Sequence, residues 1–105
     1  MKPLRLRLCT RVQAEALYYY FEHYVIPGEP EDIAESLIKD LMIKIFKKLR
    51  NKLEKYDTRG FDIQVTPDEA KAYLLYWQNR AIQPNHTLER ILIEKHIAQI
   101  DQAYA

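Results

Sequence analysis

Glycine is scarce in this chain, with only two among 105 residues, Gly28 and Gly60. Barrels and sandwiches built from many short strands use glycine in their tight turns, so the shortage argues against an all-β fold and predicts that helices dominate. The single cysteine, Cys9, excludes an internal disulfide and favours a reducing compartment. We expect Cys9 to be a small buried side chain and not a nucleophile.

Long apolar runs are also missing. No stretch approaches the ~20 apolar residues of a membrane span, and the charges at Lys2, Arg5 and Arg7 are not followed by the apolar segment of a signal peptide. We therefore expect a cytoplasmic protein that contacts no membrane. The two signs of charge are nearly balanced, with 16 basic and 15 acidic side chains. Any electrostatic function must therefore be local.

Motifs that carry catalysis or bind cofactors are absent from the sequence as well. It contains no glycine-rich phosphate loop, no paired-carboxylate signature and no nucleophile elbow. His23, His86 and His96 are too scattered for a transition-metal site, which needs three or four converging ligands. We therefore expect a protein without enzymatic activity, without a cofactor and without a bound metal.

The composition is that of a soluble globular protein, with 48% hydrophobic and 30% charged residues. At this length we expect residues 1–105 to form a single domain. Tyrosine is unusually frequent, and its densest cluster follows residue 17. At helical spacing, Tyr20, Phe21 and Tyr24 fall on one face, which predicts core packing, whereas Tyr19 points outward.

Hydrophobic periodicity predicts the element order β-α-α-β-α-α. Segments 4–8 and 61–65 alternate in the manner of half-buried strands. Four segments have helical periodicity, and residues such as Thr10 and Thr66 precede them as caps. The expected helices cover about 11–25, 30–56, 67–80 and 86–103. We therefore expect an α+β fold that is mostly α, with four helices packed on a two-stranded β-ribbon.

Two segments of the chain also resemble each other. Residues 10–26 and 66–82 share five identities over 17 positions when they are aligned at an offset of 56. Because self-similarity indicates repeated structural units, one interpretation is a pseudo-twofold repeat of the units 4–56 and 61–105. Coincidental helical periodicity is the alternative.

The second predicted helix changes character along its length. One stripe is apolar throughout and consists of Ile38, Met42, Ile45, Leu49, Leu53 and Tyr56. On the opposite side, Ile33, Leu37 and Leu41 give way to lysines. We therefore expect the first half of this helix to be buried on two faces and the second half to turn one face to the solvent.

The basic half of this helix is the strongest candidate for a contact surface. Its residues are Lys44, Lys47, Lys48, Asn51, Lys55 and, beyond the helix, Arg59. Positive side chains on one face can contact successive phosphates, although cations near a helix C-terminus are also typical of a solvated surface. Acidic residues cluster at the start of this helix: Glu29, Glu31, Asp32 and Glu35. They either complement the helix dipole or contact the basic residues of another copy.

Two functions follow as alternatives. The first is a small non-enzymatic protein of unknown specific role that acts through protein–protein contacts and self-association, using the second helix or the open edges of the ribbon. The second is a nucleic-acid-binding accessory protein that uses the basic face of the second helix.

Overall fold

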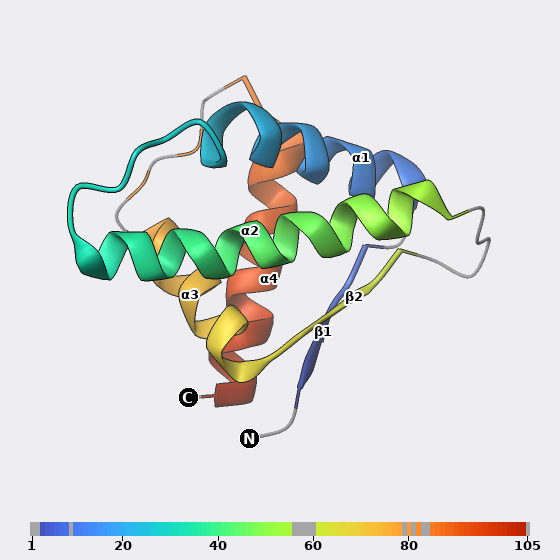
Figure 1. Cartoon of the computed structure of the whole chain (residues 1–105). Helices are drawn as coiled ribbons and strands as arrows, with labels where there is room; N and C mark the ends of the chain where they lie inside the picture. The colour runs from blue at the N-terminus through green and yellow to red at the C-terminus, as the bar shows by residue number, and fades with distance from the viewer. Residues whose placement is uncertain are drawn as a thin grey trace.

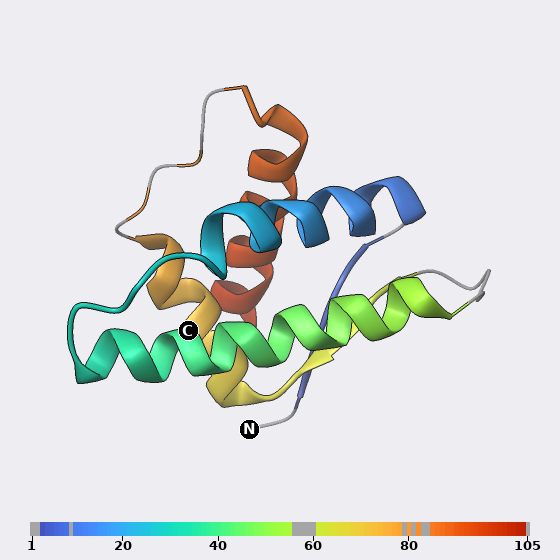
Figure 2. The ribbon, with the colours of Figure 1, turned by 45° about the horizontal axis from the view of Figure 1, so that its top comes forward.

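A computed structural model of the chain describes residues 3–8, 10–55, 61–78, 80, 82 and 85–104. The elements are β1 (Leu4–Leu6), α1 (Arg11–Tyr20), the π-helix η1 (Phe21–Val25), α2 (Ile33–Glu54), β2 (Ile63–Val65), α3 (Pro67–Gln78) and α4 (Thr87–Tyr104). Within the described residues the fold is therefore α+β and mostly α, with four α-helices and a two-stranded sheet in the predicted order. Both views show α4 crossing behind α1 and α2, with the ribbon near the C-terminal half of α2 (Figure 1, Figure 2).

The ribbon is antiparallel and has one buried face. Arg5 pairs with Gln64, and Leu6 pairs with Ile63. The first pair is exposed and the second is buried, as is Val65. This alternation follows the predicted pattern, because successive side chains of a strand point to opposite faces.

Helical side chains cover part of the outer edges of the ribbon. From α4, the Gln99 amide donates to the Arg5 carbonyl at 2.5 Å, and His96 Nε2 donates to the Arg7 carbonyl at 2.8 Å. From α2, Lys48 donates to the middle carbonyl of β2 at 2.8 Å. These three carbonyls, which we expected to be open to a partner chain, already have hydrogen-bond donors.

The hydrophobic core lies between the ribbon and the helices. Its fully buried members include Leu6, Leu17, Phe21, Met42, Ile45, Leu49, Tyr73, Ile93 and Ile100. The central residues of the predicted apolar stripe of α2, Met42, Ile45 and Leu49, therefore lie in the core. They share one face of the helix because they recur about once per turn.

The N-terminal half of α2 is not buried on two faces, so that prediction is wrong. Ile33 is 90% exposed and Leu37 is 62% exposed, while Leu41 is half-buried. The first turns of α2 lie at the edge of the molecule (Figure 1). There the neighbouring elements cover the flank that carries Ile38 and leave the opposite flank in water.

The first helix ends in a π-helix, which changes the orientation of its last side chains. A π turn holds more residues than an α turn, so the side chains that follow it are rotated away from the α-helical pattern. Val25, 1% exposed, takes the buried position, whereas Tyr24 is 43% exposed. The prediction that Tyr24 packs in the core is wrong for this reason.

The two proposed repeat units agree at some positions and differ at others. Thr10 and Thr66, which the repeat aligns, accept hydrogen bonds in the same way from backbone N–H groups three residues later. At the same offset Leu37 aligns with Ile93, and these two differ, because Leu37 is 62% exposed and Ile93 is 0% exposed. The internal repeat stays a prediction.

Candidate functional site

The predicted basic face of α2 consists of both exposed and bonded side chains. The exposed members are Lys44, Lys47, Asn51 and Lys55. The Lys48 ammonium instead contacts the Glu69 carboxylate at 2.5 Å and the Gln64 carbonyl at 2.8 Å. Arg59 lies outside the described residues, as does Cys9. The surface available to a polyanion is therefore smaller than the sequence predicts.

Glu69 explains why Lys48 is held. Its side chain is only 5% exposed, and a buried carboxylate is destabilising unless it is paired and hydrogen-bonded. Its Oε1 accepts from the Thr66 N–H at 2.8 Å, while Thr66 Oγ1 accepts from the Glu69 N–H at 3.2 Å. This reciprocal capping box starts α3, and Lys48 supplies the compensating charge.

A single stripe of α2 runs from apolar to basic. Its members at the surface are Ile33, Leu37, Lys44, Asn51 and Lys55. At 3.6 residues per turn, these five positions lie within an arc of about 40°. One side of the helix therefore offers apolar side chains at its N-terminal end and cations at its C-terminal end.

The acidic residues at the start of α2 serve as caps. Asp32 Oδ1 accepts from the Glu35 N–H at 2.8 Å, and Glu35 Oε2 accepts from the Glu31 N–H at 2.7 Å. These bonds satisfy backbone donors that have no partner within the helix. These acidic side chains lie near the surface, so α2 has acidic residues at its N-terminal end and lysines toward its C-terminal end.

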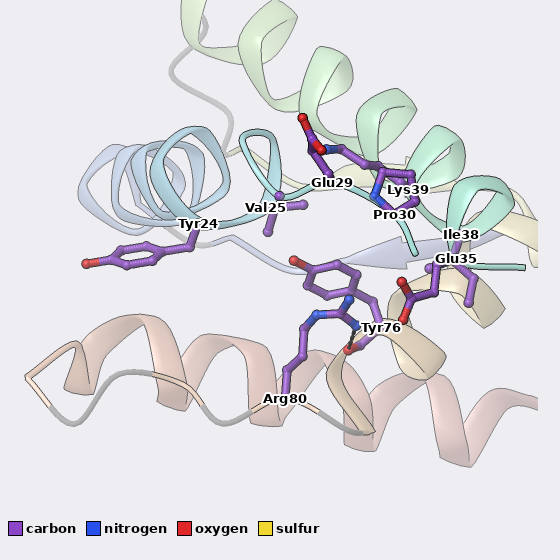
Figure 3. Close-up of a pocket in the computed structure, with 10 residues that line it drawn as sticks. Tyr24, Val25, Glu29, Pro30, Glu35, Ile38, Lys39, Tyr76 and Arg80 are labelled. Atoms are coloured by element: carbon purple, nitrogen blue, oxygen red, sulfur yellow. Dashed lines mark hydrogen bonds between the residues drawn. The ribbon is translucent and has the colours of Figure 1, made fainter. Parts of the chain in front are cut away.

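A small cleft lies where the loop before α2 approaches α3 (Figure 3). Its volume is about 130 Å³, below the range of ~300–1,000 Å³ typical of small-molecule sites. The Arg80 guanidinium lies 3.9 Å from the centre of the Tyr76 ring. Burial raises the pKa of Tyr76, while the Arg80 charge opposes this shift. We interpret the cleft as a packing junction.

A larger pocket of about 400 Å³ lies between η1 and the start of α4. The described residues that line it are Ala16, Tyr19, Tyr20, His23, Tyr24, His86 and Glu89, and we call it the tyrosine–histidine pocket. The Tyr24 hydroxyl lies 3.2 Å from His86 Nε2, and His86 Nδ1 lies 3.5 Å from a Glu89 carboxylate oxygen. A chain of three polar groups therefore crosses the pocket.

Sequence reasoning missed this pocket. His23 and His86 lie on different elements and are far apart in the chain, so no spacing relates them. The available signal was the row of tyrosines, but regular α-helical geometry assigned Tyr24 to the core. Only the π-helix turns it toward His86.

The third histidine, His96, is 1% exposed. Its Nε2 lies 2.8 Å from the Arg7 carbonyl, which can only accept, so this nitrogen carries the proton. Its Nδ1 therefore accepts from the Tyr73 hydroxyl at 3.0 Å. Burial lowers the pKa of His96, although the hydrogen bond to Arg7 and the charge of Asp62 oppose the shift. Burial likewise raises the pKa of Tyr73. The two side chains link the segment after β1 to α3 and α4 within the core.

Among the described residues, no three histidines, cysteines or carboxylates are placed so that they could hold a metal ion. None of the helices in the described part of the chain combines the length and apolarity that a bilayer crossing requires. Comparisons with family models, curated proteins and solved structures found no match to this chain. The function must therefore be argued from the surfaces described above.

Proposed function

We propose that this protein acts through protein–protein contacts and self-associates through α2, without catalysing a reaction. The exposure of Leu37, at 62%, one turn after Ile33, at 90%, carries the proposal. Covering apolar surface is favourable by ~25 cal/mol per Å². Neighbouring exposed apolar side chains on one helix face are therefore a natural contact surface. We also propose a cytoplasmic location, which the single cysteine supports.

The charges along α2 favour a second copy of this chain as the partner. If two α2 helices pack antiparallel with Leu37 near a twofold axis, Lys44 of one copy lies about 10 Å along the helix from the axis, and Ile33, the first helical residue of the other copy, lies about 6 Å from it on the same side. Lys44 of one copy then lies near the acidic segment 29–32 that precedes α2 in the other, and the apolar side chains meet in the centre. A contact of this kind closes at two copies.

Sedimentation velocity at tens of micromolar protein tests the proposal. We expect a dimer for the natural chain and a monomer for Leu37→Ser. Val12→Ser is the matched control, because Val12 on α1 is 66% exposed and the change removes apolar surface away from α2. A monomeric natural chain, or equal effects of both substitutions, would contradict self-association through α2.

The alternative is nucleic-acid binding by the basic face of α2. The exposure of Lys44, Lys47 and Lys55 supports it, but the pairing of Lys48 with Glu69 leaves fewer cations for successive phosphates. Gel retardation at low and physiological salt distinguishes the two functions. Retardation that is lost in Lys44→Glu/Lys47→Glu would favour the alternative, whereas a dimer that retards no nucleic acid would favour self-association.

A further inference from the structure

The tyrosine–histidine pocket carries an inference that does not depend on self-association. We propose that it binds a small organic cation with a methylated ammonium group. Three features support this ligand class: the arrangement of the rings, the charge among them, and the hydrogen bonds already made by the polar atoms of the pocket.

The rings form a corner. Tyr20 and Tyr24 lie 4.7 Å apart between centroids with 32° between their planes, so the two rings pack against each other, and Tyr24 remains 43% exposed. His86 stands at 76° to the Tyr20 ring and at 72° to the Tyr24 ring, with centroids at 5.2 Å and 5.3 Å. Because these three rings contact one another, a cation would lie over their outer surface, where the exposed Tyr19 and Tyr24 side chains line the pocket. Cations are attracted to the faces of aromatic rings.

The charge in the pocket is negative. Glu89 is the carboxylate among its described lining residues, and its side chain is only 16% exposed. Because partial burial lowers the effective dielectric constant, this carboxylate attracts a cation more strongly than a surface carboxylate would. An anionic ligand would be repelled, so a cation is the complementary guest.

The polar contacts in the pocket favour a methylated cation over a primary one. His86 hydrogen-bonds the Tyr24 hydroxyl at 3.2 Å, and its other ring nitrogen lies 3.5 Å from one Glu89 oxygen. A primary ammonium has three N–H donors that need acceptors. A quaternary ammonium has none and requires only ring surface and a nearby negative charge.

The backbone supports a binding role for this pocket. Short π-helices often lie at functional sites, and η1 places Tyr24 in the pocket instead of the core. The volume of about 400 Å³ lies within the range of ~300–1,000 Å³ found for small-molecule sites. The pocket is therefore large enough for a small cation. The π-helix η1 shapes it by directing the Tyr24 side chain into its lining.

Titration of the full chain followed by NMR tests the proposal with choline and with free Nε-trimethyl-lysine. We expect saturable shifts of the Tyr24 and His86 signals with both cations. The neutral isostere of choline, 3,3-dimethylbutan-1-ol, and unmethylated lysine should bind at least about 5-fold more weakly. Equal binding of the neutral alcohol, or no saturable binding of either methylated cation at millimolar concentration, would overturn the proposal.

Substitutions separate the charge from the rings. Glu89→Gln should weaken choline binding about 5- to 10-fold, whereas Glu22→Gln, the same change at an exposed residue of η1 outside the pocket lining, should leave it unchanged. Tyr24→Leu should weaken binding about 3- to 30-fold, and Tyr24→Phe should retain it because the ring face remains. Equal losses in the two Tyr24 variants, or in the two glutamate variants, would contradict a cation–π site with Glu89 as its counter-charge. Binding should persist in Leu37→Ser, which distinguishes this proposal from self-association.

Discussion

Lys48 of α2 and Glu69 of α3 form an ion pair at 2.5 Å in which the carboxylate is 5% exposed and the lysine 37% exposed. The same lysine donates to the Gln64 carbonyl of β2, and the same carboxylate accepts from the Thr66 N–H. One contact therefore positions a helix, a strand and the start of a second helix. It also removes Lys48 from the surface that could meet phosphates.

The first prediction concerns this junction. Glu69→Ala should lower the free energy of unfolding by about 1–3 kcal/mol, because it leaves the Thr66 N–H without its acceptor and Lys48 without its counter-charge. Urea denaturation measures the change. Glu54→Ala is the control, since Glu54 meets Arg50 in an exposed pair at 4.0 Å, and it should change stability by less than about 0.5 kcal/mol. Equal effects would contradict a stabilising role for the buried pair.

The second prediction is a pH dependence that originates at His96. Its pKa in the folded chain is lowered from the ordinary value of 6.5, so below that pH the unfolded chain binds the proton more readily. The His96 contribution to stability is therefore complete above pH 6.5 and is lost as the pH falls toward the lower pKa of the folded state, by up to ~1.4 kcal/mol per pH unit.

Urea denaturation between pH 7.5 and 5.5 tests this dependence. The slope should be smaller in His96→Gln, whose side-chain amide can still donate to the Arg7 carbonyl. It should remain in His23→Gln, because His23 is exposed. An unchanged slope in His96→Gln would assign the pH dependence to other groups.

The third prediction concerns the Tyr73 hydroxyl. Tyr73→Phe removes the donor to His96 Nδ1 and leaves a buried acceptor without a partner, so the free energy of unfolding should fall by about 1–3 kcal/mol. Tyr19→Phe, at a side chain that is 54% exposed, should have little effect. In a double-mutant cycle, the Tyr73→Phe and His96→Gln effects should be non-additive, and additive effects would contradict the direct bond.

The fourth prediction tests the antiparallel α2 dimer and depends on the proposed self-association. Lys44→Glu should weaken the dimer, because it places a carboxylate near the acidic residues that precede α2 in the other copy. The double variant Lys44→Glu/Glu31→Lys should restore it by exchanging the charges. Sedimentation at low and high salt measures both effects, and a double variant that dimerises no better than Lys44→Glu would exclude this register.

Local signals in the sequence were sufficient for the elements themselves. Thr10 and Thr66 cap α1 and α3 as predicted, and alternation identified the paired strands with Leu6 and Ile63 inward. These features depend on hydrogen bonds and side-chain periods within a few residues, so they can be read without knowledge of the rest of the chain. The same signals specified which stripe of α2 faces the core.

Tertiary structure alone decided which surfaces are covered and which distant groups meet. The apolar character of Leu37 predicts burial, but no neighbouring element reaches that flank of α2, and the side chain stays exposed. The contact of Tyr24 with His86 requires both a π turn and the approach of α4. Sequence periodicity carries no information on either. The exposure of Leu37 depends on how far α2 extends past its neighbours, and the Tyr24–His86 contact depends on how two distant segments pack.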